Sequence, residues 1–170
     1  MPGKKYLAQS AGNIIEEASI QSSAGAEDAG KVVALDSGGK IHNSMMPTGI
    51  GAETKLLAAS ENLSAGDFVN IYDDAGTTKC RKADASTNKR ADGFVLAAVT
   101  IGNNATVYTE GINNQLSGLT GGSYYFLSGA TPGGSVTTAP STSGHIVQEV
   151  GKALSATEIS FEPSKPITLA

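Results

Sequence analysis

Short runs of β-favouring residues alternate with turns of glycine, proline, serine and threonine between residues 120 and 163. No run in this segment has the length of an ordinary helix, and turn residues recur about every 8–12 positions. This spacing is typical of a small all-β barrel or sandwich. The strands expected in this segment are residues 123–127, 135–138, 145–153 and 157–161.

The same pattern extends back to residue 53, which predicts one β domain over residues 53–163 and a short C-terminal tail over residues 164–170. Residues 93–101 are the most apolar stretch and are expected to form one strand. Gly102, Asn103 and Asn104 after it predict a hairpin turn. The other strands expected in this domain are residues 54–60 (or a short helix there), 68–72, 77–83 and 105–110.

Residues 1–52 differ from the rest of the chain because their apolar residues are isolated among alanine, glycine and serine. Residues 13–20 suit either a helical turn or a short strand, residues 31–35 are β-like, and residues 36–40 predict a tight turn. So little apolar surface cannot offset the entropy cost of folding alone. The sequence therefore predicts a mainly β protein in which an extended N-terminal arm, ordered by another surface, precedes the barrel or sandwich.

The apolar residues of this arm are the candidates for contact with a partner or with another subunit. Methionine suits irregular pockets, and Pro47 is expected to end the last extended segment of the arm. Free strand edges in the arm are suited to pairing with a partner sheet. The alternative is that these side chains pack on the chain's own barrel. The candidates are Ile14, Ile15, Val32, Leu35, Ile41, Met45, Met46 and Pro47.

The composition limits how much surface one copy can bury. Apolar residues make up 39% of the chain and aromatic residues 5%, with no tryptophan. Buried apolar surface contributes roughly 25 cal/mol per Å². A core of small aliphatic side chains therefore favours additional burial between subunits or against a larger surface.

Charge and cysteine content exclude several classes of protein. The net charge is −4 at pH 7, which argues against binding nucleic acid or an anionic membrane surface. The sequence has no apolar run of about 20 residues for a membrane span, and its first residues lack a secretory signal pattern. A single cysteine rules out an intramolecular disulfide framework, so synthesis in a reducing cytoplasm is expected.

Residues that could perform chemistry are few and scattered. Two histidines and one cysteine, His42, His145 and Cys80, do not make up a zinc ligand set. Alternation along a strand places Cys80 on the face opposite Lys79 and Arg81, so its thiol is expected to fill the core. We expect no catalytic residue, no bound metal and no cofactor, and hence no enzyme.

One aromatic segment, residues 124–126, leaves two interpretations open. Successive strand residues point to opposite faces, so Tyr124 and Phe126 share one face. Packing of these two rings in the core is the expected arrangement. The alternative is a platform on which a sugar stacks.

Two parts of the sequence resemble phage structural proteins. Residues 30–51, GKVVALDSGGKIHNSMMPTGIG, resemble a linker element, Gly-Lys-(Ile/Val)-Val-x-Leu-Asp-x-x-Gly-Lys-(Ile/Leu)-x-x-Ser-x-(Met/Leu)-Pro, that recurs in head decoration proteins and fibres of tailed bacteriophages. Residues 63–72 and 121–163 resemble the β module of phage capsid decoration (cement) or head-fibre proteins. Together these segments cover about two-thirds of the chain.

The resemblance implies a structural protein that binds the outside of an icosahedral capsid, usually as a homotrimer. Its partners would be the major capsid protein and further copies of itself, and its location would be the outer capsid surface of the virion. Because fibres share the linker element, a tail-fibre or spike module that binds a host-surface glycan is the alternative.

Overall fold

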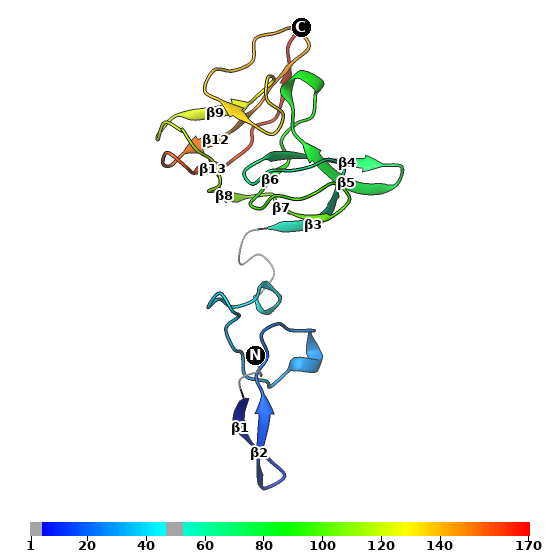
Figure 1. The fold of residues 1–170 in the computed structure, drawn as a ribbon, viewed down its shortest axis with the longest axis vertical. Coiled ribbons are helices and arrows are strands. Elements are labelled where there is room, and N and C mark those ends of the chain that lie inside the picture. The colour runs from blue at the N-terminus through cyan, green and yellow to red at the C-terminus, as the bar shows by residue number, and fades with distance from the viewer. Residues whose placement is uncertain (1–4, 47–52) are drawn as a thin grey trace. The chain divides into compact units, whose positions relative to one another are not determined.

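A computed structural model describes residues 5–46 and 53–170 of the chain. The chain divides into two compact units, residues 1–51 and residues 52–170. Figure 1 shows the elements of each unit. The expected mainly β architecture is confirmed, because strands dominate the described residues and helices are limited to short 3-10 turns.

The C-terminal unit begins with a closed five-stranded barrel (Figure 1). The strand order around the barrel is β3-β5-β4-β6-β7, and β7 pairs again with β3. β3 closes the barrel because it pairs parallel to β5 and antiparallel to β7. Small side chains fill the interior, among them Val69, Cys80 and Val107, each fully buried. The strands are β3 (Thr54–Ala59), β4 (Phe68–Asp74), β5 (Thr77–Lys82), β6 (Gly93–Val95) and β7 (Asn104–Tyr108).

A five-stranded antiparallel sheet packs against this barrel, with strand order β10-β9-β12-β13-β8. The two share one apolar core in which the ring of Phe161 lies 5.8 Å from that of Phe68 and 5.5 Å from that of Phe94. The barrel and the sheet therefore form a single domain. The sheet consists of β8 (Gly111–Asn113), β9 (Tyr124–Leu127), β10 (Ser135–Val136), β12 (Glu149–Ala153) and β13 (Ile159–Phe161).

Residues 164–170, expected as a tail, contain one strand. β14 (Ile167–Thr168) pairs antiparallel with β11 (Ile146–Val147). Leu169 N also donates to His145 O at 2.9 Å. The chain's end is thus hydrogen-bonded to the segment that precedes β12.

The N-terminal unit contains a hairpin of β1 (Lys5–Ser10) and β2 (Asn13–Ala18), followed by irregular chain with two short 3-10 helices, η1 (Ala26–Asp28) and η2 (Asn43–Met45). Residues 13–20 therefore start as a strand and not as a helical turn. The β-like segment 31–35 forms one bridge, Val33 to Ile20. The expected tight turn is present: the Asp36 carboxylate accepts from Gly38 N at 2.8 Å and from Lys40 N at 2.9 Å.

One expected strand of the C-terminal unit is shorter than predicted. The strand expected over residues 93–101 ends at Val95, because the chain then leaves the barrel wall and exposes Ala97 and Ala98. Val99 returns as a single bridge to Leu63. Between β5 and β6 the chain forms the 3-10 helix η3 (Ala85–Thr87), whose Asp84 cap accepts from Ser86 N at 2.8 Å.

Gly151 lies at a β-bulge in β12, where the register with β9 shifts between Glu149 and Gly151. Its φ of 140° is disfavoured for other residues, and a Cβ there would collide with the carbonyl oxygen of Ser160.

Gly151→Ala should lower the free energy of unfolding by on the order of 3 kcal/mol, measured by denaturant melting. Gly121→Ala, where the nearest atom to an added Cβ is 3.8 Å away, is the control and should change it by less than about 1 kcal/mol. Equal effects of the two changes would refute this account of the bulge.

Candidate functional site

The N-terminal unit has almost no core of its own among its described residues. Ala34 is the one buried apolar side chain there, and no residue of this unit belongs to either apolar cluster of the described chain. Eight large apolar side chains are exposed instead: Leu7, Ile14, Ile15, Val32, Val33, Leu35, Ile41 and Met46. An unusual share of this unit's apolar surface is thus open for contact.

The candidate contact residues predicted from the sequence lie on this unit. Met45 is half-buried, and Pro47 lies outside the described residues. The other six candidates are exposed: Ile14, Ile15, Val32, Leu35, Ile41 and Met46. Nothing in the structure shows which surface covers them, so their role as anchors stays a prediction.

Sequence reasoning missed Leu7, which is 75% exposed and as prominent as Ile14 at 76%. Leu7 is paired with Glu16 across the hairpin and therefore lies diagonal to Ile14 on one face. Ile15 lies on the other face, opposite Ala8. Both faces of the hairpin therefore carry apolar side chains.

The two turn residues, Ala11 and Gly12, are the feature of the sequence from which this hairpin could have been predicted. Ala11 and Gly12 both have positive φ, at 49° and 85°, as a two-residue type I′ turn requires. Alanine is uncommon at such a position, so the sequence pattern was weak. Two-stranded hairpins are marginally stable in water, which makes this one dependent on further contacts.

Polar contacts order the loops of the N-terminal unit. Lys31 Nζ lies 2.9 Å from Asp28 Oδ1, and Ala24 N donates to Asp28 Oδ2 at 2.6 Å. The Lys31 ammonium and this amide lower the pKa of Asp28. The backbone amides of Lys40 and Gly38 likewise lower the pKa of Asp36. In this unit, which has almost no apolar core among its described residues, hydrogen bonds to the carboxylates of Asp28 and Asp36 hold the turns in place.

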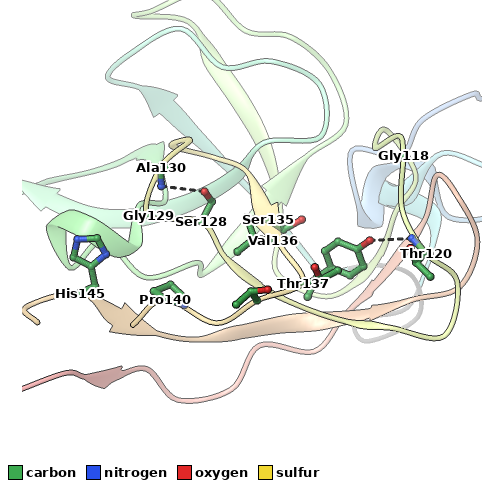
Figure 2. A pocket seen from close by; sticks show the side chains of 12 residues that line it. Gly118, Thr120, Ser128, Gly129, Ala130, Ser135, Val136, Thr137, Pro140 and His145 are labelled. Atoms are coloured by element: carbon green, nitrogen blue, oxygen red, sulfur yellow. Dashed lines mark hydrogen bonds between the residues drawn. The ribbon is translucent and has the colours of Figure 1, made fainter. Parts of the chain in front are cut away.

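A groove of about 710 Å³ lies on the C-terminal unit (Figure 2). Ser128 Oγ accepts from Ala130 N at 3.1 Å, and Tyr125 Oη accepts from Thr120 N at 2.9 Å. The imidazole of His145 packs on Gly129, where an added Cβ would lie 2.8 Å from Nδ1. The described lining holds no carboxylate, lysine, arginine or thiol beside this histidine; its polar side chains are hydroxyl groups and the imidazole.

Cys80 and His42, two of the side chains that could perform chemistry, have ordinary structural surroundings. Cys80 is fully buried in the barrel, as expected, and burial raises the pKa of its thiol. His42 Nδ1 lies 2.9 Å from Ser44 Oγ in the N-terminal unit. Within residues 5–46 and 53–170 no three histidine, cysteine or acidic side chains gather as metal ligands, and no helix is long and apolar enough to cross a membrane.

The expected core packing of Tyr124 and Phe126 is wrong. The register of β9 turns the other pair inward: Tyr125 is 5% exposed and Leu127 is fully buried, whereas Tyr124 is 53% exposed and Phe126 is half-buried. Lys152 Nζ, on the neighbouring strand β12, lies 5.4 Å from the centre of the Tyr124 ring. One aromatic ring thus faces solvent on the outer side of the sheet.

Comparisons of this chain with protein-family models, with curated proteins and with solved structures found no match.

The Asp36 turn should respond to acid before the barrel does. Because the folded pKa of Asp36 is lowered, the stability that it contributes is present above the pKa of the unfolded chain and is lost as pH falls through the folded value. The amide signals of Gly38 and Lys40 should therefore shift in NMR spectra below the ordinary aspartate range while the signals of Val69 and Val107 stay in place. Asp36→Asn should remove this transition; its survival in that variant would contradict the assignment.

Proposed function

We propose that this chain is a structural decoration (cement) protein, which binds the outside of a phage capsid and stabilises the junctions between capsomers. Its partners are the major capsid protein and, in a homotrimer, two further copies of itself. It is made in the host cytoplasm and located on the outer capsid surface of the virion. Two observations support this. Residues 30–51 resemble an element of phage head decoration proteins and fibres, and residues 63–72 and 121–163 resemble the β module of capsid decoration or head-fibre proteins. The N-terminal unit also exposes many large apolar side chains.

The exposed apolar surface of residues 5–46 carries the proposal. A side chain of the size of leucine or isoleucine contributes about 1.5–3 kcal/mol when it is fully buried. Docking of Leu7 and Ile14, which share one face of the hairpin, would therefore supply several times the thermal energy. The free edges of β1 and β2 add main-chain hydrogen bonds if a partner strand joins the hairpin.

Bridging explains how such binding would strengthen a shell. Packaged DNA pushes the capsomers of a phage head apart. A protein that contacts two capsomers adds buried area that separation must expose again, which raises the barrier to opening. The C-terminal unit has its own core, so it can remain folded while the N-terminal unit makes these contacts.

A tail-fibre or spike module that binds a host glycan is the second candidate. Its support is the exposed ring of Tyr124, on which a sugar face could stack, and the hydroxyl-lined groove beside β10. The location of the chain on assembled particles separates the two functions. Labelled antibody on capsid faces favours decoration, and label on tails favours the glycan-binding module.

Removal of residues 1–51 should leave the C-terminal unit folded but abolish stable attachment to capsids. The reason is that both apolar clusters lie beyond residue 51, whereas the exposed apolar side chains concentrate before it. Circular dichroism reports the fold, and co-sedimentation with particles that lack the chain reports attachment. Full occupancy by the truncated protein would refute the role of the N-terminal unit.

Ile14→Asp should reduce capsid binding by at least about tenfold, because an unpaired charge buried at an interface costs several kcal/mol. The melting temperature of the free protein should stay within about 2 °C, since Ile14 is exposed there. Ile101→Asp is the matched control, an isoleucine that is 57% exposed on the other unit. Equal binding loss in both variants would show that added charge, and not the hairpin, is responsible.

A further inference from the structure

The outer face of the β4–β5 hairpin carries a connected set of polar side chains that the proposed docking does not use. Asn70 is paired with Arg81 across the two strands, and Tyr72 with Lys79. Cross-strand partners point to the same face of a sheet. Val69 and Cys80, the neighbours of Asn70 and Arg81 in sequence, point into the barrel and are fully buried.

The guanidinium group of Arg81 is held in place by two contacts. Its carbon Cζ lies 4.0 Å from the centre of the Tyr72 ring, a cation–π distance. Its Nε donates to Asn70 Oδ1 at 3.0 Å. A side chain ordered in this way has already lost most of the rotamer entropy that binding a ligand would otherwise cost.

Asn70 is itself fixed by Asp92. Asn70 Nδ2 donates to Asp92 Oδ2 at 2.9 Å, and Ile71 N donates to the same oxygen at 2.9 Å. A charged carboxylate only accepts and a guanidinium only donates, so the amide of Asn70 has one orientation that satisfies both neighbours. Asn70 is 7% exposed, which makes this arrangement part of the barrel wall.

Arg81 keeps an uncompensated charge in the described part of the chain. Three neighbouring cations are paired: Lys79 with Asp74 at 2.7 Å, Lys82 with Asp67 at 3.2 Å and Arg90 with Asp92 at 2.6 Å. No such ion pair occurs for Arg81 within the described residues, and its hydrogen bond there uses Nε alone. Neither terminal NH₂ group of Arg81 thus has a protein partner among residues 5–46 and 53–170, and the side chain is only half-buried.

We infer that Arg81 is a preorganised binding site for one carboxylate of a partner protein, an aspartate or glutamate side chain. The planar guanidinium matches a carboxylate in a two-bond geometry. The single positive charge of Arg81, which has no ion-pair partner in the described residues, suits a singly charged ligand, whereas a phosphate dianion would leave an excess negative charge at the site. An acidic sugar is less suited, because the Tyr72 ring on which it could stack already contacts Arg81.

This inference concerns a contact on the barrel and does not rest on docking by the N-terminal unit. Its first test is an NMR titration of the full chain, labelled with ¹⁵N, at constant ionic strength. N-acetyl-glutamic acid amide is the carboxylate probe, N-acetyl-glutamine amide its neutral match, and inorganic phosphate the other anion. The Arg81 Nε–H signal and the Tyr72 amide signal report binding.

The expected result is a saturable shift of both signals with the carboxylate probe alone. Arg81→Lys keeps the charge but loses the two-bond geometry, and should weaken the probe's effect on the Tyr72 signal by about fivefold or more. Lys55→Gln removes an exposed charge from another barrel strand and should have no effect. A linear, non-saturable shift, or a shift with phosphate that equals the carboxylate effect, would overturn the inference.

The carboxylate could come from a second copy of this chain or from another protein, and a second measurement distinguishes these sources. Sedimentation of the full chain at increasing concentration compares wild type with Arg81→Gln, and capsid co-sedimentation compares the same pair. Weaker self-association in the variant identifies a second copy as the source, and weaker capsid retention alone identifies another protein. If neither changes in a variant that melts like wild type, Arg81 does not bind a protein carboxylate.

Discussion

The contact between the rings of Phe68, Phe94 and Phe161 joins the barrel to the five-stranded sheet, and the rest of the C-terminal unit depends on it. Phe68 and Phe94 belong to barrel strands, whereas Phe161 belongs to β13 of the sheet. The centre of the Phe161 ring lies 5.8 Å from that of Phe68 and 5.5 Å from that of Phe94, within the range of favourable aromatic pairs. In a chain that is only 5% aromatic, three of its four phenylalanines meet at this junction.

A buried glutamine, Gln148, also joins the two parts of this unit and fixes their alignment by hydrogen bonds. Ala91 N donates to Gln148 Oε1 at 2.7 Å, and Gln148 Nε2 donates to Ala91 O at 3.0 Å. Gln148 is 2% exposed, so the loop before β6 and the segment before β12 are tied by bonds that water cannot replace. The aromatic contact supplies the burial, and the glutamine specifies how the two parts align. The N-terminal unit has no comparable junction among its described residues, which is why a partner surface is central to our account.

Much of this architecture could be predicted from the sequence, because alternation and turn residues report strands directly. The mainly β fold, the turn at Asp36 and the burial of Cys80 all follow from local patterns. Features set by distant contacts could not be predicted. Nothing local reveals that β9 turns Tyr125 inward and Tyr124 outward, since either register satisfies alternation.

The same limit applies to the candidate sites. The apolar residues of the N-terminal unit could be named from the sequence, but Leu7 was missed because its hairpin turn uses alanine at a position that favours glycine or asparagine. The Arg81 site combines three segments: Arg81 lies on β5, Asn70 and Tyr72 lie on β4, and Asp92 lies just before β6. Only the barrel's strand pairing makes them neighbours, and no spacing in the sequence signals it.

The central claim is that the N-terminal unit becomes stably ordered by docking on a partner. Amide hydrogen exchange, measured by mass spectrometry on the free and the capsid-bound chain, tests it most directly. Our account predicts rapid exchange in β1 and β2 of the free chain, at least about tenfold slower exchange in the same strands on capsids, and slow exchange in β4 and β12 in both states. Equal protection of the hairpin in the free and bound chain would contradict it.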